Sequence, residues 1–209
     1  MLDSIRTVQK KDPIQKQIIY SILNFVFGVC LGIFSKALDT TGFNELPRIM
    51  QILDITNFLG RFAIWIFIAV CISVYSSSAK RAALNVFLFF IGMTSSYYLY
   101  STFVVGFFPR SYALIWFGLT AVSPVLAYFC WYAKGDGWIA VAFSGGIIGV
   151  LLSQAVFLFQ GIRISFIPEV IVWLASLWVL RRKPKEFVGE IVLSVAVAAL
   201  VQIFVPFWG

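Results

Sequence analysis

Long apolar runs, separated by short polar segments, form the pattern of this chain. The runs are continuous, and most approach the roughly 20 residues that a helix needs to cross a membrane. A β-barrel would show segments of about 10 residues in which apolar and polar positions alternate. The pattern therefore predicts an all-α polytopic transmembrane helix bundle with about seven spans, at residues 17–38, 58–75, 85–107, 112–131, 138–159, 166–180 and 187–207. If the shortest run, 166–180, is re-entrant, the number of spans becomes six.

The polar segments give the rest of the organisation. Residues 1–16 are predicted to be a basic cytoplasmic tail, and residues 17–209 a single transmembrane helical domain. In the longest loop, four apolar residues follow a helical spacing: Leu46, Ile49, Met50 and Leu53. This spacing predicts an amphipathic helix near 46–56, which either covers a binding site or simply joins two spans.

Two of the predicted spans carry small residues four positions apart. They are Gly28 and Gly32 in the first span, and Gly145 and Gly149 in the fifth. Such spacing lets two helices approach closely in lipid, so these glycines are candidate helix-packing residues. The partner is either another subunit or a helix of the same bundle.

The segment 85–107 is apolar throughout, yet hydroxyl-bearing residues fill its middle. A helix surrounded by lipid gains nothing from hydroxyl groups, so this segment is predicted to be the central helix, facing other helices or a polar cavity. We take as candidate ligand-binding residues Asn85, Ser96, Tyr97, Tyr100, Trp116, Gln154 and Glu169. For Asn85 a structural bond to a neighbouring helix is the alternative. For Glu169 the alternatives are an ion pair with Arg163 and a ligand or proton site.

The amino-acid composition excludes several kinds of catalytic and metal-binding site. The chain is 61% hydrophobic and 12% charged, and it has no histidine, which excludes His-ligated metals and His-dependent nucleophiles. Its three cysteines, Cys30, Cys71 and Cys130, lie in apolar segments without a CxxC motif. We find no nucleophile–base pair, no paired intramembrane carboxylates and no cluster of charged residues at one interface. No catalytic residue, metal, cofactor or enzymatic activity is predicted.

The net charge of +7 fits a membrane protein better than a nucleic-acid-binding one. With the N-terminus inside, eleven of the 16 Lys and Arg residues fall in inner segments and five in outer ones. Cytoplasmic loops of membrane proteins carry such an excess. The chain is predicted to be a multi-pass protein of the cell membrane, with its N-terminus cytoplasmic and its C-terminus outside.

Three runs, FGVCLGIFSKALDT, AALNVFLFFIGMTSSYYLY and AVSPVLAYFCWYAK, resemble a family of small uncharacterised integral membrane proteins of clostridia-like bacteria. The resemblance covers roughly residues 24–135 and implies a multi-pass protein without a known activity. The last predicted span, 187–207, is additional to that family's pattern.

The chain is also similar to the substrate-binding subunits of energy-coupling factor vitamin transporters. The similarity lies in its size, its predicted inner N-terminus, the small-residue seam of the first span and the long first outer loop. It implies vitamin uptake with an ATPase module. Those subunits have six spans and an alanine-based seam, whereas this chain has Gly28 and Gly32 and about seven predicted spans, so no residue role is transferred.

These features favour a membrane protein that binds or translocates a small molecule. The alternative is a non-catalytic structural or interaction subunit of a membrane complex, because the packed faces of two spans need a partner. The expected partners are the lipid bilayer, a small-molecule ligand and other membrane subunits or an ATPase module, with no nucleic acid.

Overall fold

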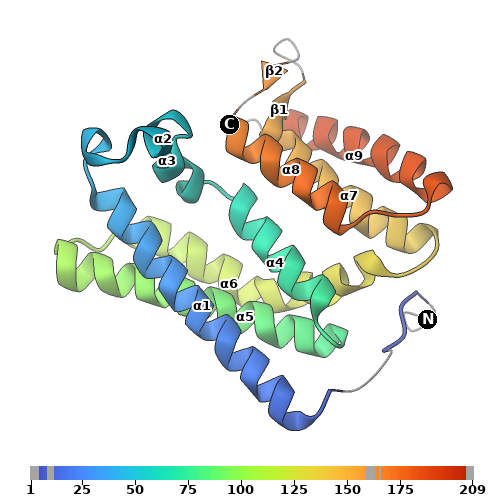
Figure 1. Cartoon of the computed structure of the whole chain (residues 1–209), viewed down its shortest axis with the longest axis horizontal. Helices are drawn as coiled ribbons and strands as arrows, with labels where there is room; N and C mark the ends of the chain where they lie inside the picture. Colours follow the sequence, from blue (N-terminus) through green and yellow to red (C-terminus); the bar gives the residue numbers. More distant parts are fainter. Residues whose placement is uncertain (1–4, 9–11, 159–162, 165, 206–209) are drawn as a thin grey trace. The chain divides into compact units, whose positions relative to one another are not determined.

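The computed structural model describes residues 5–8, 12–158, 163–164 and 166–205. Within them the regular secondary structure is helical except for one short antiparallel hairpin, β1 (Val156–Phe157) and β2 (Arg163–Ile164), in which Val156 pairs with Ile164 (Figure 1). The α-helices are α1 (Ile14–Thr40), α2 (Arg48–Ile52), α3 (Ile55–Gly60), α4 (Ala63–Tyr75), α5 (Ala79–Tyr100), α6 (Arg110–Cys130), α7 (Trp138–Ala155), α8 (Ile167–Val179) and α9 (Pro184–Phe204). Short turns of 3-10 or π geometry lie at Phe43–Glu45, Ser101–Val105 and Trp131–Lys134.

Each predicted span corresponds to a helix. Five helical stretches are long and apolar enough to cross a membrane: Ile14–Thr40, Ala79–Val105, Arg110–Lys134, Trp138–Ala155 and Pro184–Phe204. By helix length and composition the chain is a multi-pass helical membrane protein. The apolar helices α4 and α8 have 13 residues each. At 1.5 Å per residue they extend about 20 Å, less than the roughly 30 Å hydrocarbon core. The total of about seven spans therefore stays a prediction.

The polar loop is built differently from the predicted amphipathic helix near 46–56. Two short helices, α2 and α3, replace one continuous helix, and the chain turns between them at Asp54. Asp54 has a φ of 51°, a left-handed conformation that Asp adopts more readily than most residues. A second break, at Arg61, separates α3 from α4. Of the predicted basic tail, residues 1–4 and 9–11 lie outside the described part of the chain.

The fold divides into two compact units. The α1–α5–α6 unit comprises Val8–Gln51 and Ile72–Trp131. The α7–α8–α9 unit comprises Met1–Thr7, Ile52–Cys71 and Tyr132–Gly209, and so includes α3 and most of α4.

In the α1–α5–α6 unit, α5 contacts both α1 and α6. Ser78 begins α5 as its N-cap, because its hydroxyl accepts a hydrogen bond from the backbone N–H of Arg81. The glycines of α1 lie directly on α5: a Cβ at Gly28 would overlap the carbonyl oxygen of Phe89, and one at Gly32 would overlap that of Met93. The missing side chains thus allow the two backbones to touch.

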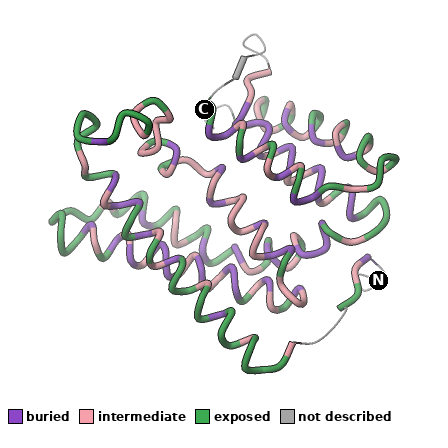
Figure 2. Tube along the Cα trace, in the orientation of Figure 1, coloured by how far each residue is buried: buried purple, intermediate pink, exposed green. Residues whose placement is uncertain are grey.

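In the α7–α8–α9 unit, α7 contacts both α9 and α8 and is the most buried of the long helices, as the colouring of Figure 2 shows. A Cβ at Gly149 would lie 2.6 Å from the carbonyl oxygen of Ser194 on α9. On its other side, Leu151 packs with Val172 of α8 and with Phe58 and Ala63 of α3 and α4. This cluster fixes α3 and the start of α4 against α8.

Candidate functional site

A buried ion pair joins the end of α3 to the start of α8. Nε of Arg61 donates to Oε1 of Glu169 at 2.5 Å. Glu169 lies in the first turn of α8, after Pro168, where the helix dipole favours a carboxylate. Its side chain is 1% exposed, whereas that of Arg61 is 23% exposed. An ionisable pair in an apolar unit is costly, and within membranes such groups commonly mark a functional site.

Buried polar atoms without hydrogen-bond partners occur on the same elements as this pair. Among the described residues, seven buried side-chain polar atoms have no hydrogen-bond partner. Four belong to α3, α8 and the residue that follows α3: Thr56 Oγ1, Arg61 Nη2, Glu169 Oε2 and Trp173 Nε1. Buried polar groups in folded proteins are nearly always hydrogen-bonded, so this concentration calls for an explanation.

Gln154 is brought to the same end of the unit. Its side chain is 7% exposed, and its Nε2 is another of the unpartnered atoms. The hairpin makes α7 and α8 antiparallel, and Leu151 packs in one cluster with Val172. Three residues beyond Leu151 lies Gln154, and three before Val172 lies Glu169. The two sequence-predicted residues of this unit therefore lie at one level.

Arg61 lies between two carboxylates: that of Glu169, which is buried, and that of Asp54, whose side chain is 29% exposed. Nη1 of Arg61 is 3.7 Å from Oδ2 of Asp54, and its guanidinium lies 3.9 Å from the ring centre of Phe166. Since the ring faces a cation that Glu169 also binds, Arg61 is fixed in place while Nη2 remains available. The site can offer N–H donors from Arg61, Trp173 and Gln154, and a carboxylate oxygen as acceptor.

The other five predicted ligand-binding residues lie in the α1–α5–α6 unit, so the seven divide into two groups. The amide of Asn85 accepts from Ser21 Oγ at 2.9 Å and donates to Ser76 Oγ at 3.2 Å. Ser96 Oγ donates to the carbonyl oxygens of Val29 and Met93, both at 3.1 Å. These polar groups have partners inside the helix bundle.

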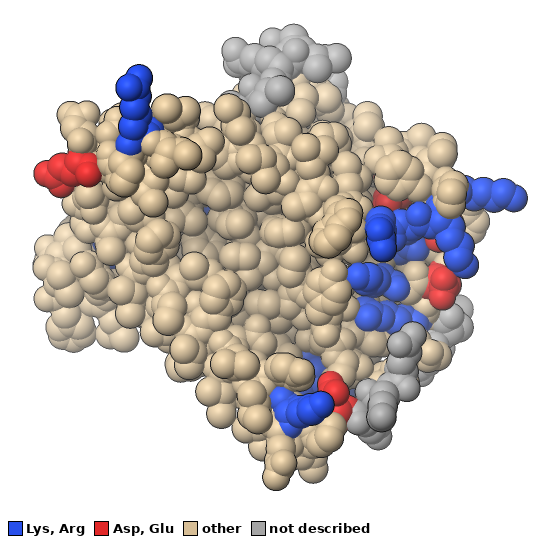
Figure 3. Space-filling view, viewed as in Figure 1, with Lys and Arg blue, Asp and Glu red and all other residues tan. Residues whose placement is uncertain are grey.

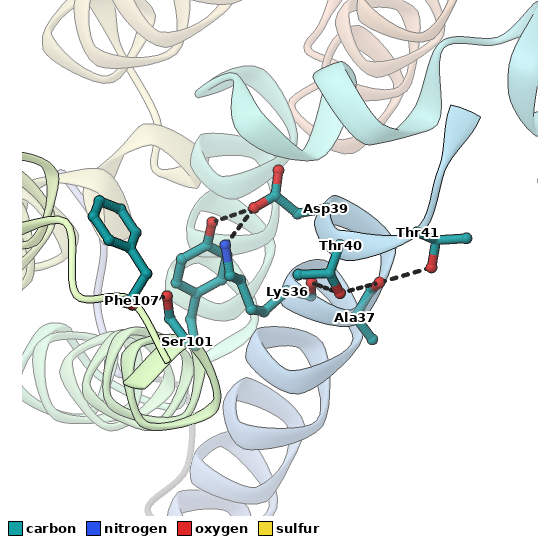
Figure 4. Close-up of polar contacts among 8 residues, drawn as sticks. Lys36, Ala37, Asp39, Thr40, Thr41, Ser101 and Phe107 are labelled. Carbon is teal, nitrogen blue, oxygen red and sulfur yellow. Dashed lines mark hydrogen bonds and ion pairs between the residues drawn. The ribbon is translucent and has the colours of Figure 1, made fainter. Parts of the chain in front are cut away.

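The remaining three lie nearer the surface. Tyr97 donates to Oδ2 of Asp39 at 3.1 Å, and Lys36 donates to the same oxygen at 2.6 Å, as Figure 4 shows for Lys36 and Asp39. Tyr100 and Trp116 are half-buried, on α5 and α6. The role of these five residues in ligand binding stays a prediction.

Sequence reasoning missed the partner of Glu169. The predicted partner was Arg163, whose side chain lies outside the described residues, whereas the structure has Arg61 at that carboxylate. Arg61 was not among the predicted site residues. The usable signal was that a carboxylate in an apolar segment needs a cation, and Arg61 is a basic residue within another predicted span, 58–75.

A cluster of charged residues also exists where none was predicted. It surrounds a cavity of about 380 Å³ at the α8–α9 loop, lined by Lys134, Gly135, Asp136, Leu180, Arg181, Arg182, Lys183 and Glu186. The prediction that no charged cluster gathers at one interface is thus wrong. Arg182 donates to the carbonyl oxygens of Ala133 and Gly135, just before α7. Figure 3 shows basic side chains gathered on one side of the molecule.

No family model, no curated protein and no solved structure matches the chain. Neither of the resemblances drawn from the sequence gains support from these comparisons, and no family is identified.

Proposed function

We propose that this membrane protein binds a small polar molecule at the Arg61–Glu169 pair and carries it across the bilayer. The observation that supports the proposal is the concentration of unpartnered buried polar atoms around that pair. A ligand that hydrogen-bonds to these atoms would remove a desolvation penalty of about 1–3 kcal/mol for each group.

The arrangement favours a ligand without net charge. Arg61 and Glu169 neutralise each other in the buried part of the site, and the second carboxylate, Asp54, is 29% exposed to solvent. A charged ligand would therefore add an uncompensated charge to an apolar unit. The free donors suit oxygen acceptors, and Glu169 Oε2 suits an N–H or O–H group. A neutral or zwitterionic molecule with both kinds of group fits, and no step of catalysis is included.

The interaction-subunit alternative started from glycine faces that needed a partner. Gly28 and Gly32 pack against α5, and Gly145 and Gly149 pack against α9. Because helices of the same chain cover these faces, small-molecule binding is the better supported of the two functions.

The test is a thermal-shift screen of the purified protein in detergent, against amino acids, sugars, polyols and nucleosides. A ligand present at 100 times its dissociation constant stabilises by about 2.7 kcal/mol, which raises the melting temperature measurably. Trp173→Phe removes one N–H donor and should weaken binding several-fold. Glu169→Gln should abolish it. Uptake of the radiolabelled compound into proteoliposomes then tests translocation.

The matched control is Trp178→Phe on the same helix, since Trp178 is 69% exposed. It should leave binding unchanged. If no neutral polar compound stabilises the protein, or if both tryptophan variants bind equally well, the proposed site is wrong.

A further inference from the structure

The two long helix pairs, α1 with α5 and α7 with α9, begin in the same way. Arg81 in the first turn of α5 donates through Nη2 to Ser21 Oγ on α1, at 2.8 Å. Arg182, just before α9, donates through Nε to Ser144 Oγ on α7, at 2.9 Å. In each pair an arginine at the start of the second helix is bonded to a serine of the first.

The glycine contacts also match along each seam, although Ser21 lies seven residues before Gly28 and Ser144 lies directly before Gly145. Eight residues after Arg81, the carbonyl of Phe89 faces Gly28, and eight after Arg182, the carbonyl of Glu190 faces Gly145. It extends one turn further, to the pairs Gly32–Met93 and Gly149–Ser194. Phe89 and Glu190 thus occupy equivalent positions in two similar seams, and both are 0% exposed.

The comparison of these two positions indicates that helix packing does not need the carboxylate of Glu190. Phe89 shows that an apolar side chain at this position supports close packing of the two helices. A buried carboxylate at the same place costs free energy, because its charge must leave water. The geometry of the seam does not require that cost, so the carboxylate serves another purpose.

Glu190 is paired but not hydrogen-bonded. Its Oε1 lies 3.3 Å from Nε of Arg182, yet neither of its oxygens accepts a hydrogen bond from the described residues. The donors of Arg182 are directed elsewhere: Nη1 to the carbonyl of Gly135 at 3.0 Å and to Glu186 at 3.4 Å, and Nη2 to the carbonyl of Ala133. One guanidinium therefore faces two carboxylates, Glu186 and Glu190, and the group lacks one positive charge.

A proton is the only positive charge small enough to fit beside the Glu190 carboxylate. Glu190 is fully buried against α7, and a Cβ on Gly145 would already lie 3.1 Å from its carbonyl oxygen. A metal ion would need several ligands, and no group of three His, Cys, Asp or Glu residues gathers within the described ranges. When two carboxylates share one cation, a single proton restores neutrality.

The cavity at the α8–α9 loop gives the proton a route. Glu186 lines it, is 24% exposed and lies one helical turn before Glu190 on α9. The other charged groups around this route are Lys134 and Asp136 from the loop before α7, and Arg181 and Lys183 from the loop before α9. Lys134 and the arginines keep the mouth basic.

We propose that Arg182, Glu186 and Glu190 form an exchangeable proton site. The Glu190 carboxylate takes one proton from solvent by way of Glu186 and the cavity, and its new O–H group can donate to Ser144 Oγ. Arg182 stays paired with Glu186, so the charge of the group changes from −1 to zero. The reverse path releases the proton. This site is separate from the Arg61–Glu169 pair and does not depend on its function.

Infrared difference spectroscopy of the full chain in lipid nanodiscs, between alkaline and mildly acidic buffer, tests the proposal. We expect the C=O stretching band of a carboxylic acid to appear as the pH falls. Glu190→Gln should remove this band, and Glu186→Gln should slow its appearance after a pH jump several-fold. Glu45→Gln, which alters an exposed carboxylate, should leave it unchanged.

Glu190→Phe copies the α1–α5 seam and gives a second, folded reference if Glu190→Gln is unstable. It too should lack the band while keeping a near-native melting temperature. A band that persists in Glu190→Phe, or a wild-type protein with no exchangeable carboxylic acid band, would overturn the proposal and leave a permanent structural ion pair.

Discussion

The α1–α5 and α7–α9 helix pairs share one plan but treat their polar groups differently. In the first pair, Asn85 exchanges hydrogen bonds with Ser21 and Ser76, so its amide has partners on both sides. In the second pair, Glu190 lies at 3.3 Å from Arg182 without a hydrogen bond to either oxygen among the described residues. The first seam is closed by satisfied polar contacts, and the second contains a charge that its packing does not need.

The difference extends to the units as a whole. All seven unpartnered buried side-chain atoms in the described residues belong to the α7–α8–α9 unit. Satisfied polar networks make a helix bundle rigid and specific, whereas unsatisfied ones are a source of binding energy. We infer that the α1–α5–α6 unit is mainly a scaffold, and that the chemistry of the protein is concentrated in the other unit.

Removing the arginine from each helix pair should give the largest difference in stability between the two pairs. Arg182→Met leaves Glu190 as a buried charge without its cation, which we expect to cost about 3–5 kcal/mol of unfolding free energy. Arg81→Met removes donors to Ser21 and to the carbonyl of Gln17, both partly exposed to water, and should cost about 1–2 kcal/mol. Unfolding in mixed SDS micelles measures both losses.

A double variant gives the control for this prediction. Adding Glu190→Phe to Arg182→Met removes both charges and copies the apolar α1–α5 seam, so it should recover most of the lost stability. Equal losses for Arg81→Met and Arg182→Met, without recovery in the double variant, would mean that the two arginines act only as similar structural clamps.

Replacing a seam glycine with alanine should lower the unfolding free energy, and the loss should be larger where the two helices lie closer together. Gly28→Ala places a Cβ against the carbonyl of Phe89, a backbone atom that cannot move alone, and should cost about 1–3 kcal/mol. Gly145→Ala meets Leu193 Cδ2 at 3.0 Å, and Leu193 Cβ and the carbonyl oxygen of Glu190 at 3.1 Å. This overlap is smaller than the one at Gly28, so the substitution should cost less. The same SDS titration ranks the two.

Matched controls exist on helices of both units. A Cβ at Gly118 of α6 or at Gly146 of α7 would meet no atom within 4 Å. Gly118→Ala and Gly146→Ala should therefore cause no loss of stability, and alanine's higher helix propensity should help slightly. If Gly145→Ala proves as damaging as Gly28→Ala, the helices approach equally closely at both glycines and the expected difference in packing is wrong.

The sequence predicted the helices better than the site, for physical reasons. The bilayer sets the length and apolar character of a span, so seven apolar runs could be found from local pattern alone. The pairing of Glu169 with Arg61 joins residues 108 positions apart, and only the packing of α3 on α8 brings them together. The sequence analysis instead placed the ligand site at the hydroxyl-rich middle of α5, where Ser96 already donates hydrogen bonds to two carbonyl groups.

The Arg182 cluster, by contrast, could have been recognised. Arg182 precedes α9, and Glu186 and Glu190 follow at four and eight positions, the spacing that places carboxylates on one helix face. The burial of Glu190 could not be predicted from the sequence, because it depends on α7 covering this face of α9. Periodicity can thus show which residues share a helix face, whereas tertiary packing decides which of them are buried.

The smallest effect tests whether satisfied contacts in the α1–α5–α6 unit are as weak as its scaffold role implies. Thr94 of α5 and Thr120 of α6 are 3.1 Å apart and almost fully buried. Since the hydroxyl of Thr120 already donates to the carbonyl of Trp116 at 2.8 Å, Thr94 is the donor between them. A double-mutant cycle of Thr94→Val and Thr120→Val should give a coupling of about 0.6 kcal/mol, the average for bonds between membrane helices. Thr102→Val, which loses a bond to its own helix, should show no coupling to Thr120→Val. A Thr94–Thr120 coupling above about 2 kcal/mol, beyond the usual range in membranes, would show that this unit also depends on strong polar contacts, and the contrast between scaffold and site would fail.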